Sequence, residues 1–192
     1  MRIYKLLLSF TALLLLVLFS GCDSNSKAQN SQIEFTNNFA GTFVNGTIDT
    51  NNDGFVVSLL SEQGSSNALG PNIINSEFEL IPIVTIVPCT TSNDNPGFLS
   101  MLEQGAQVIT LENNDQILVE MTELIQCTSN NIETDPSFSF EGEGNIADGT
   151  GQFENATGSL TINGTGRFSI SDTSGFFGSA AGISQGIIEL NP

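Results

Sequence analysis

The sequence has no histidine, no tryptophan and a single tyrosine, Tyr4. Without histidine, neither a Ser-His-Asp arrangement nor a histidine general base is available for catalysis. Carboxylates are then the main side chains left for acid–base chemistry. The composition therefore favours a non-catalytic protein over an enzyme, and we assign no catalytic residue from the sequence.

Positive charge is also scarce, with four Lys and Arg residues against 21 Asp and Glu residues. Arg2 and Lys5 precede residue 22, so the rest of the chain has only Lys27 and Arg167, and a net charge of −19. Nucleic acid is excluded as a partner because its binding depends on Lys and Arg neutralising phosphates. Direct adhesion to an anionic membrane surface is disfavoured for the same reason. We interpret the acidic surface as a source of solubility, with acid-mediated ligand binding as the alternative.

Residues 1–21 have the parts of an export signal. Arg2 and Lys5 provide the positive start, residues 6–19 are almost entirely apolar, and small residues follow in Ser20-Gly21-Cys22. The apolar stretch is shorter than the roughly 20 residues of a membrane span, which disfavours an N-terminal transmembrane anchor. An ordinary secreted protein is the remaining alternative to a lipid-anchored one.

The residues around Cys22 resemble the lipobox of bacterial lipoproteins, although Phe19 stands where Leu is usual. The resemblance implies cleavage before Cys22, a diacylglycerol on its sulfur and an amide-linked acyl chain. Two or more chains anchor a protein stably. The lipid bilayer is therefore a predicted partner, and the domain is expected outside the cytoplasm, on the bacterial cell membrane or outer membrane. Asp23 resembles the inner-membrane retention signal of enteric bacteria, and the choice of membrane stays open.

The segment after the signal divides into a tether and one domain. Residues 22–32 are small and polar without periodicity, which is typical of a flexible tether. Residues 33–192 are enough for a single domain with a real core. If Cys22 carries lipid, Cys89 and Cys127 are left as a pair in an oxidising compartment, and we predict a disulfide between them. A metal or reactive-thiol role is disfavoured, because the chain offers no histidine and the spacing fits no zinc pattern.

Short segments of alternating hydrophobicity predict an all-β domain. In residues 160–171 one face is apolar or glycine and the other is wholly polar, and residues 138–146 repeat this arrangement. Two glycines on each apolar face allow a sheet to bend enough to close. We expect the two strands to pair across residues 149–158, with Arg167 on the same outward face as Glu141 and Glu143.

Further strands are expected at residues 39–48, 55–62, 77–87, 107–111, 116–123 and 182–190. The fold predicted from this count is a small, roughly eight-stranded antiparallel barrel that follows the signal peptide. Residues 96–104 are expected to form a short helical turn, acting as a lid or plug.

The run Asp148-Gly-Thr-Gly-Gln-Phe-Glu-Asn-Ala-Thr-Gly158 resembles the G-T-G-x-F-x-x-A-x-G signature of allene-oxide-cyclase-like and dirigent-like barrels, and of related uncharacterised bacterial exported proteins. The resemblance implies an eight-stranded antiparallel barrel. It implies no activity, because none of the pocket residues of the plant cyclases can be matched here. Physically the run is a turn device, in which Gly149 and Gly151 allow positive φ, Phe153 plugs the barrel end, and Gly158 starts the next strand.

One segment matches the first half of a calcium-binding loop. Asp49, Asn51 and Asp53 occupy positions one, three and five, and Gly54 occupies position six. Position twelve is Leu60 in place of the bidentate Glu, and the flanks are predicted strands. A hairpin turn is the favoured interpretation, with weak calcium binding as the alternative and the single candidate cofactor.

Glu79 is the acid that stands out, because it lies within an apolar run. Burial would raise its pKa, but strand alternation predicts that Glu77 and Glu79 point outward while Phe78 points inward. The predicted function is a non-catalytic binding or structural lipoprotein that holds a small hydrophobic ligand or contacts an envelope protein. The alternative is a cyclase or isomerase that steers a small hydrophobic substrate by shape, which would require a buried carboxylate or Asn in the barrel.

Overall fold

The computed structural model describes residues 31–45, 57–82, 88–91, 93–131, 133–171 and 175–191, all within one compact unit, Asn30–Asn191. These residues form nine strands and one short 3-10 helix. The elements are β1 (Ser31–Asn45), β2 (Ser58–Ser66), β3 (Gly70–Pro82), β4 (Pro88–Thr90), β5 (Pro96–Leu111), β6 (Gln116–Ser129), β7 (Ser137–Gly149), η1 (Gly151–Phe153), β8 (Thr157–Ser171) and β9 (Gly175–Leu190). No helix in these ranges has the length and apolar character needed to cross a membrane.

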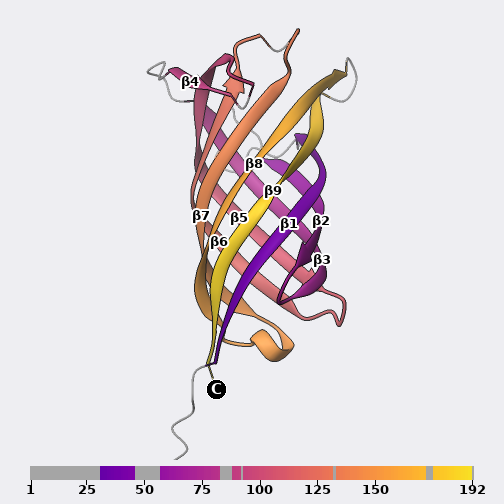
Figure 1. The fold of residues 1–192 in the computed structure, drawn as a ribbon, viewed down its shortest axis with the longest axis vertical. Coiled ribbons are helices and arrows are strands. Elements are labelled where there is room, and N and C mark those ends of the chain that lie inside the picture. The colour runs from indigo at the N-terminus through magenta and orange to yellow at the C-terminus, as the bar shows by residue number, and fades with distance from the viewer. Residues whose placement is uncertain are drawn as a thin grey trace, which may run out of the picture. The chain divides into compact units, whose positions relative to one another are not determined.

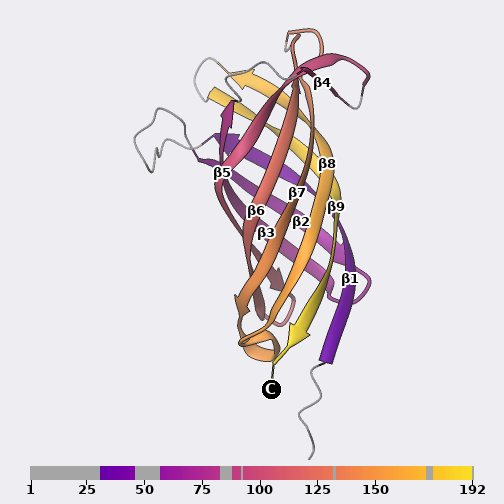
Figure 2. The same ribbon diagram turned by 90° about the vertical axis from the view of Figure 1, so that its left-hand side faces the viewer.

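Eight of the strands close into an antiparallel barrel (Figures 1 and 2). The ring runs β1-β2-β3-β5-β6-β7-β8-β9, and β9 pairs with β1. The three-residue β4 pairs with the start of β5, beyond the end of β3. The predicted fold class is confirmed, as is the pairing of β7 with β8, which begins where Ile146 lies opposite Gly158.

The barrel is sealed where the first strand meets the last. Ser31 pairs with Leu190, and the side-chain amide of Gln32 donates a 3.1 Å hydrogen bond to Glu189 Oε1. Strand β1 therefore begins at Ser31, two residues before the domain boundary expected from the sequence. Ser31 and Gln32 belong to the sheet because the end of β9 is available to pair with them.

The glycines on the inward faces of β8 and β9 make room for phenylalanine rings. The rings of Phe43, Phe138 and Phe168 pack together, with centroids 4.6–5.5 Å apart. A Cβ on Gly166 would lie 2.1 Å from Phe138 Cζ, and one on Gly178 would lie 2.6 Å from Phe43 Cζ. At Gly166, one of the glycines expected to let the sheet bend, the missing side chain thus serves a close approach of an aromatic ring to the backbone, and Gly178 does the same for Phe43.

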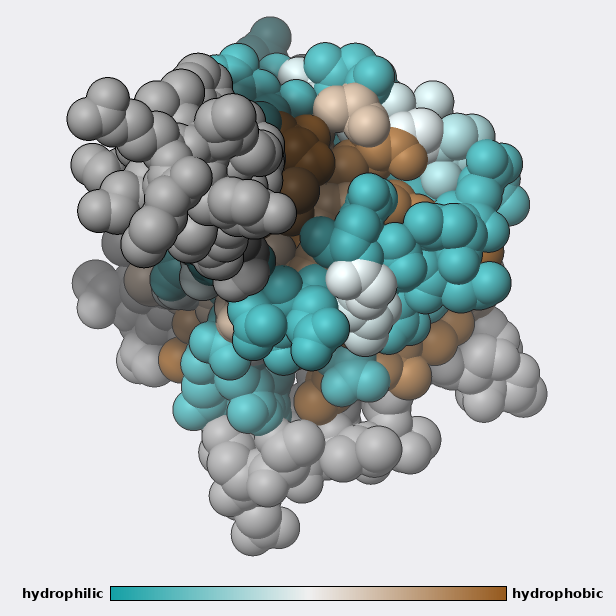
Figure 3. Space-filling model, turned by 90° about the horizontal axis from the view of Figure 1, so that it is seen from below, coloured by the Kyte–Doolittle hydropathy of each residue, from teal (hydrophilic) through white to brown (hydrophobic). Residues whose placement is uncertain are grey.

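The connection from β7 to β8 forms the turn expected of the glycine-rich run, with one difference. Gly151 has φ of +61° and Gly158 has φ of +149°, and Phe153 is fully buried at this end of the barrel. Gly149 does not have a positive φ, contrary to the prediction. Its lack of a side chain is still required, because a Cβ there would lie 2.6 Å from Phe153 Cβ. Seen from this end, hydrophobic side chains lie behind a rim of hydrophilic residues (Figure 3).

The prediction of a helical turn at residues 96–104 is wrong, because this segment is the first half of β5. Its backbone is paired on both sides, with Pro88 opposite Phe98 on one edge and Cys127 opposite Leu99 on the other. Such two-sided pairing satisfies the backbone groups that a helical turn would otherwise satisfy internally. The cluster of apolar residues in the segment fits either structure, and the neighbouring strands decide between them.

The predicted disulfide between Cys89 and Cys127 is confirmed, with Cα atoms 5.9 Å apart. It joins β4 to β6 across β5, at the end of the barrel opposite η1 (Figure 1). Asp135 organises the neighbouring loops, since it accepts hydrogen bonds from Asn95 Nδ2 at 2.6 Å and Ser137 Oγ at 2.8 Å. These bonds, that of Asn95 first, lower the pKa of the Asp135 carboxyl, and Arg167 adds to the effect.

Candidate functional site

Polar side chains line part of the barrel interior, on the strands from β9 through β1, β2 and β3 to β5. We call this set the interior polar cluster. Its members each expose at most 6% of their surface, and they are Asn37, Glu62, Asn72, Ser76, Gln107 and Ser184. They point inward because they take alternate positions on strands whose other inward residues are apolar or glycine. On β1, for example, Asn37 lies between the buried Phe35 and Phe39.

Asn37 and Asn72 hold each other across the strand that separates them. Asn37 Nδ2 donates to Asn72 Oδ1 at 3.2 Å, and Asn72 Nδ2 donates to Asn37 Oδ1 at 3.1 Å. The pair passes over Gly64 of β2, where an added Cβ would lie 2.1 Å from Asn72 Oδ1. Asn72 Nδ2 also donates to the Gly70 carbonyl at 2.9 Å, so this part of the cluster is well satisfied.

Gln107 and Ser184 keep unused hydrogen-bonding capacity. Gln107 lies opposite Ser76 in the β3–β5 register and donates to Ser76 Oγ at 3.1 Å. Its other amide atom, Oε1, is buried and has no hydrogen-bond partner among the described residues. The same holds for Ser184 Oγ, which lies in register with Asn37 on the neighbouring strand. Both atoms are therefore buried polar groups with unused hydrogen-bonding capacity.

Glu62 is the titratable member of the cluster. It exposes only 3% of its surface, and it lies in register with Gly41 on β1 and Ile74 on β3. A Cβ on Gly41 would lie 2.7 Å from Glu62 Cγ, so this glycine provides the space for the side chain. Burial raises the pKa of the Glu62 carboxyl to about 7, and Oε1 has no partner within the described part of the chain. The neutral carboxyl can both donate and accept a hydrogen bond.

Glu79 is fully buried, so the prediction that it points outward is wrong. The β3–β5 register shifts between Glu79 and Leu80, so that Gln104 pairs with Glu79 while Leu102 pairs with Leu80. Such a bulge breaks strict alternation, and Phe78 and Glu79 are both buried as a result. The side-chain amide of Gln104 donates a hydrogen bond to Glu79 Oε2. Glu77 is exposed, as the strand alternation predicts.

Apolar and aromatic side chains make up most of the remaining core. Phe39 stacks on Phe140 of β7 at a centroid distance of 6.4 Å, and Leu124 and Ile162 belong to the same buried cluster. The same buried apolar cluster draws side chains from β1, β3, β5, β6, β7 and β8, so the interior polar cluster lies among hydrocarbon.

The residues predicted for lipid attachment and for calcium binding are not among those that the structure describes. Cys22, Asp49, Asn51 and Asp53 lie outside the described residues, so lipid attachment and calcium binding stay predictions. Within the described ranges no group of three or more His, Cys, Asp and Glu side chains could hold a metal ion.

Sequence reasoning missed the interior polar cluster. One signal was present, because a polar residue interrupts the inward aromatic series Phe35, Phe39 and Phe43 of β1 at Asn37. The positions of Glu62 and Gln107 carry no such signal. Their burial depends on strand register, which a single segment does not reveal.

Comparison with known proteins adds no argument for the fold or the function of this chain. No described protein family and no curated protein matches the chain. A solved structure with a related arrangement is that of the pterocarpan synthase dirigent protein GePTS1, at 11% sequence identity and a TM-score of 0.44. The alignment covers 84% of this chain and 86% of that chain. The fold class stated above rests on the strand pairing itself.

Proposed function

We propose that this chain is an exported lipoprotein, anchored by lipid on Cys22, whose barrel binds a small hydrophobic ligand with one polar group and does not transform it. The sequence supports the anchor through the positive start, the apolar stretch of residues 6–19 and the small residues before Cys22. The proposed location is the periplasmic or external side of a bacterial membrane, where a ligand or an envelope protein is the partner.

The observation that supports binding is the set of unpartnered atoms inside the barrel. Glu62 Oε1, Gln107 Oε1 and Ser184 Oγ are buried without a hydrogen bond among the described residues. More than nine in ten buried polar groups are normally paired, and each one left unpaired costs roughly 1–3 kcal/mol. An N–H or O–H group of a ligand would donate to one of the unpartnered oxygens, such as Gln107 Oε1, while its hydrocarbon part packs on the phenylalanines.

Binding is tested with the full chain and the neutral fluorophore N-phenylnaphthylamine, which has one N–H donor on an apolar body. Its emission should rise on titration with the protein, because the barrel shields it from water. Gln107→Leu should weaken binding by about fivefold or more, the loss expected for one hydrogen bond. Glu77→Gln, on the exposed face of the neighbouring strand, is the matched control. Absent enhancement, or equal affinity of all three proteins, would contradict an interior ligand site.

The anchor is tested separately by labelling growing cells with radioactive palmitate. The wild-type chain should incorporate label and sediment with membranes, and Cys22→Ser should do neither. Retention of both label and membrane association by the variant would contradict lipid attachment at Cys22. Because palmitate labelling does not involve the barrel interior, the two tests are independent. Lipid attachment can be refuted while ligand binding is observed, and ligand binding can be refuted while lipid attachment is observed.

The buried carboxyl of Glu62 favours one alternative, a cyclase or isomerase acting on a small hydrophobic substrate. A carboxyl with a pKa of about 7 in an apolar interior is suited to general acid–base catalysis near neutral pH. The test is incubation of the wild type and Glu62→Gln with lipid extracts of the cells, followed by chiral chromatography and mass spectrometry. An isomer formed only by the wild type would support catalysis, whereas identical extracts favour the binding role.

A further inference from the structure

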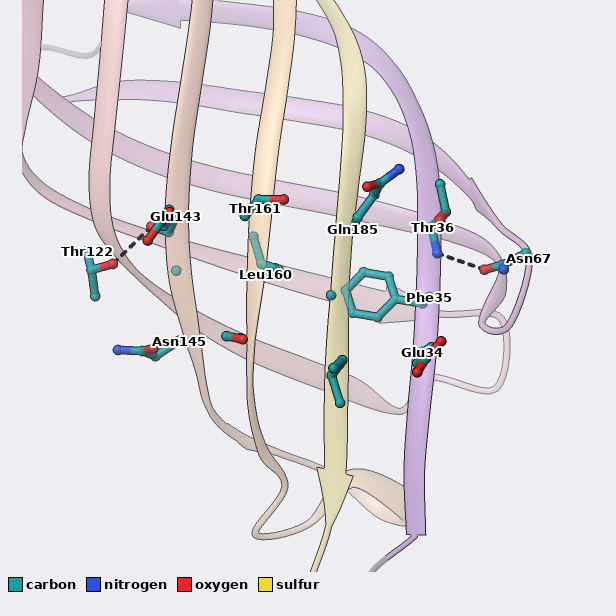
Figure 4. A pocket seen from close by; sticks show the side chains of 14 residues that line it. Glu34, Phe35, Thr36, Asn67, Thr122, Glu143, Asn145, Leu160, Thr161 and Gln185 are labelled. Atoms are coloured by element: carbon teal, nitrogen blue, oxygen red, sulfur yellow. Dashed lines mark hydrogen bonds between the residues drawn. The ribbon is translucent and has the colours of Figure 1, made fainter.

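A hollow lies on the outer wall of the barrel, away from the interior polar cluster. It has a volume of about 610 Å³ and crosses the outward faces of β6, β7, β8, β9 and β1 (Figure 4). None of the described residues that line it is basic. The site proposed above does not use this surface, which we call the outer groove.

The strand register arranges the outer groove as two parallel rows of side chains. The first row crosses four strands, from β7 to β1, through Glu143, Thr161, Gln185 and Thr36. The second row crosses the same strands through Asn145, Ser159, Ile187 and Glu34. Each row spans three interstrand spacings, or roughly 14 Å. One carboxylate ends each row, at opposite sides of the groove.

Side-chain length gives the surface its trough-like form. On β8, in the middle, the residues are the short Ser159 and Thr161. Longer side chains flank them, with Glu143 on β7 and Gln185 on β9 (Figure 4). An elongated molecule could therefore lie across the strands above β8, with hydrogen-bonding groups on both sides.

The polar groups of the groove are largely uncommitted. The Thr36 N–H donates to Asn67 Oδ1 at 2.8 Å, which holds the Asn67 side chain beside the first row. Thr122 Oγ1 donates to the backbone carbonyl of Glu143 at 3.2 Å. This bond does not involve the Glu143 carboxylate. Gln185 and Asn145 are exposed, and their amides form no hydrogen bond with other described residues. Hydroxyls, amides and carboxylates together offer donors and acceptors along the whole groove.

We propose that the outer groove binds a neutral oligosaccharide of a few sugar units. Sugar hydroxyls both donate and accept, as this mixture of groups requires, and Ile187, 40% exposed, offers an apolar contact for the C–H face of a ring. An anionic ligand is disfavoured by the two carboxylates and the absence of a basic residue in the described lining.

A peptide fits the groove less well than a sugar chain. The strands β7, β8, β9 and β1 are each paired on both sides, so none offers an edge for an added strand. A helical peptide would need a mainly apolar groove, and nine of the 14 lining residues here are polar. The two carboxylates of the lining stand on β1 and β7, three strand spacings apart, so the groove is proposed to bind a sugar and not to cleave it.

The proposal is tested by backbone amide NMR with cellotriose, maltotriose and triacetylchitotriose as probes. Concentrations up to about 10 mM cover the millimolar affinity that a few exposed hydrogen bonds provide. At least one probe should shift the resonances of the outward residues on β7, β8, β9 and β1. Gln185→Ala and Asn145→Ala should each weaken that binding by about fivefold or more.

The matched control is Gln63→Ala, an exposed amide on β2 outside the groove. Because all three substituted residues are exposed, the variants should melt at the wild-type temperature. The proposal is overturned if none of the three sugars shifts these resonances. It is equally overturned if the shifts map elsewhere, or if the groove variants bind as tightly as Gln63→Ala.

Discussion

Asn37 on β1 and Asn72 on β3 hold each other by two hydrogen bonds, although β2 lies between their strands. The contact exists because Gly64 of β2 has no side chain to separate the two amides. Both side chains are buried, so a lost partner leaves an amide without compensation. Three adjacent strands are thereby fixed in one register by a single pair of amides and one glycine.

Gly64→Ala should therefore destabilise the barrel by about 2–4 kcal/mol, because its Cβ would displace the Asn37–Asn72 pair. The measurement is the free energy of unfolding by urea, followed by circular dichroism. Gln63→Ala, at the adjacent exposed position, should change stability by less than about 0.5 kcal/mol. Equal stability of the two variants would show that the amide pair does not constrain this part of the sheet.

The buried carboxyl of Glu62 should make the fold less stable as the pH rises. Its pKa is about 7 in the folded protein against 4.5 for an ordinary Glu, so the folded state holds the proton more tightly. The resulting stabilisation is complete below pH 4.5 and is lost as the pH rises to about 7. The full effect is of the order of 3 kcal/mol.

Glu62→Gln isolates this effect from those of the other acidic residues, because glutamine has nearly the same shape and does not titrate. Urea unfolding at several pH values should give a wild-type profile that declines relative to the variant between pH 4.5 and about 7. Two profiles that run parallel over that range would mean that Glu62 titrates as an exposed carboxyl does.

Removal of the Cys89–Cys127 disulfide should lower stability by about 4 kcal/mol in the chain-entropy model, given a sequence separation of 38. The double variant Cys89→Ala/Cys127→Ala should melt at a lower temperature than the oxidised wild type. A reducing agent should lower the melting temperature of the wild type and leave that of the variant unchanged. Two free thiols in the mass spectrum of the unreduced protein would refute the bridge.

Phe153→Ala should destabilise the barrel by about 3–5 kcal/mol, the usual cost of deleting a buried aromatic ring. Phe153 is fully buried at the end of the barrel where η1 lies. Glu154→Ala changes the exposed neighbouring residue and serves as the control in the same thermal unfolding measurement. A loss below about 1 kcal/mol for Phe153→Ala would indicate that the ring is not a plug.

The barrel itself could be predicted from the sequence because alternation is a local property. Leu160 and Ile162 are buried while Thr161 and Asn163 are exposed, as the period of two requires. The turn after β7 was predictable for the same reason, since Gly151 and Phe153 act within a few residues of each other. Alternation and turn residues of this kind can be recognised without knowing which distant segments pair with them.

The candidate site was harder to predict because it depends on pairing between distant segments. Glu62 is buried only because its neighbours in the ring enclose it, and Glu79 is buried because of a bulge against β5. Neither the register nor the bulge is encoded within a few residues of either glutamate. The strand at residues 96–104 was missed for a related reason, since its partners lie in β3, β4 and β6.

The seam between β1 and β9 has a consequence for how the molecule is made. Gln32 and Glu189, which bond across it, are separated by 157 positions along the chain. During synthesis the backbone groups on one edge of β1 therefore stay unpaired until β9 has been made. Unpaired strand edges can pair with strands of other chains. Contacts this distant in sequence also form slowly. A protein of this design depends on being kept from premature association until its final strand has emerged.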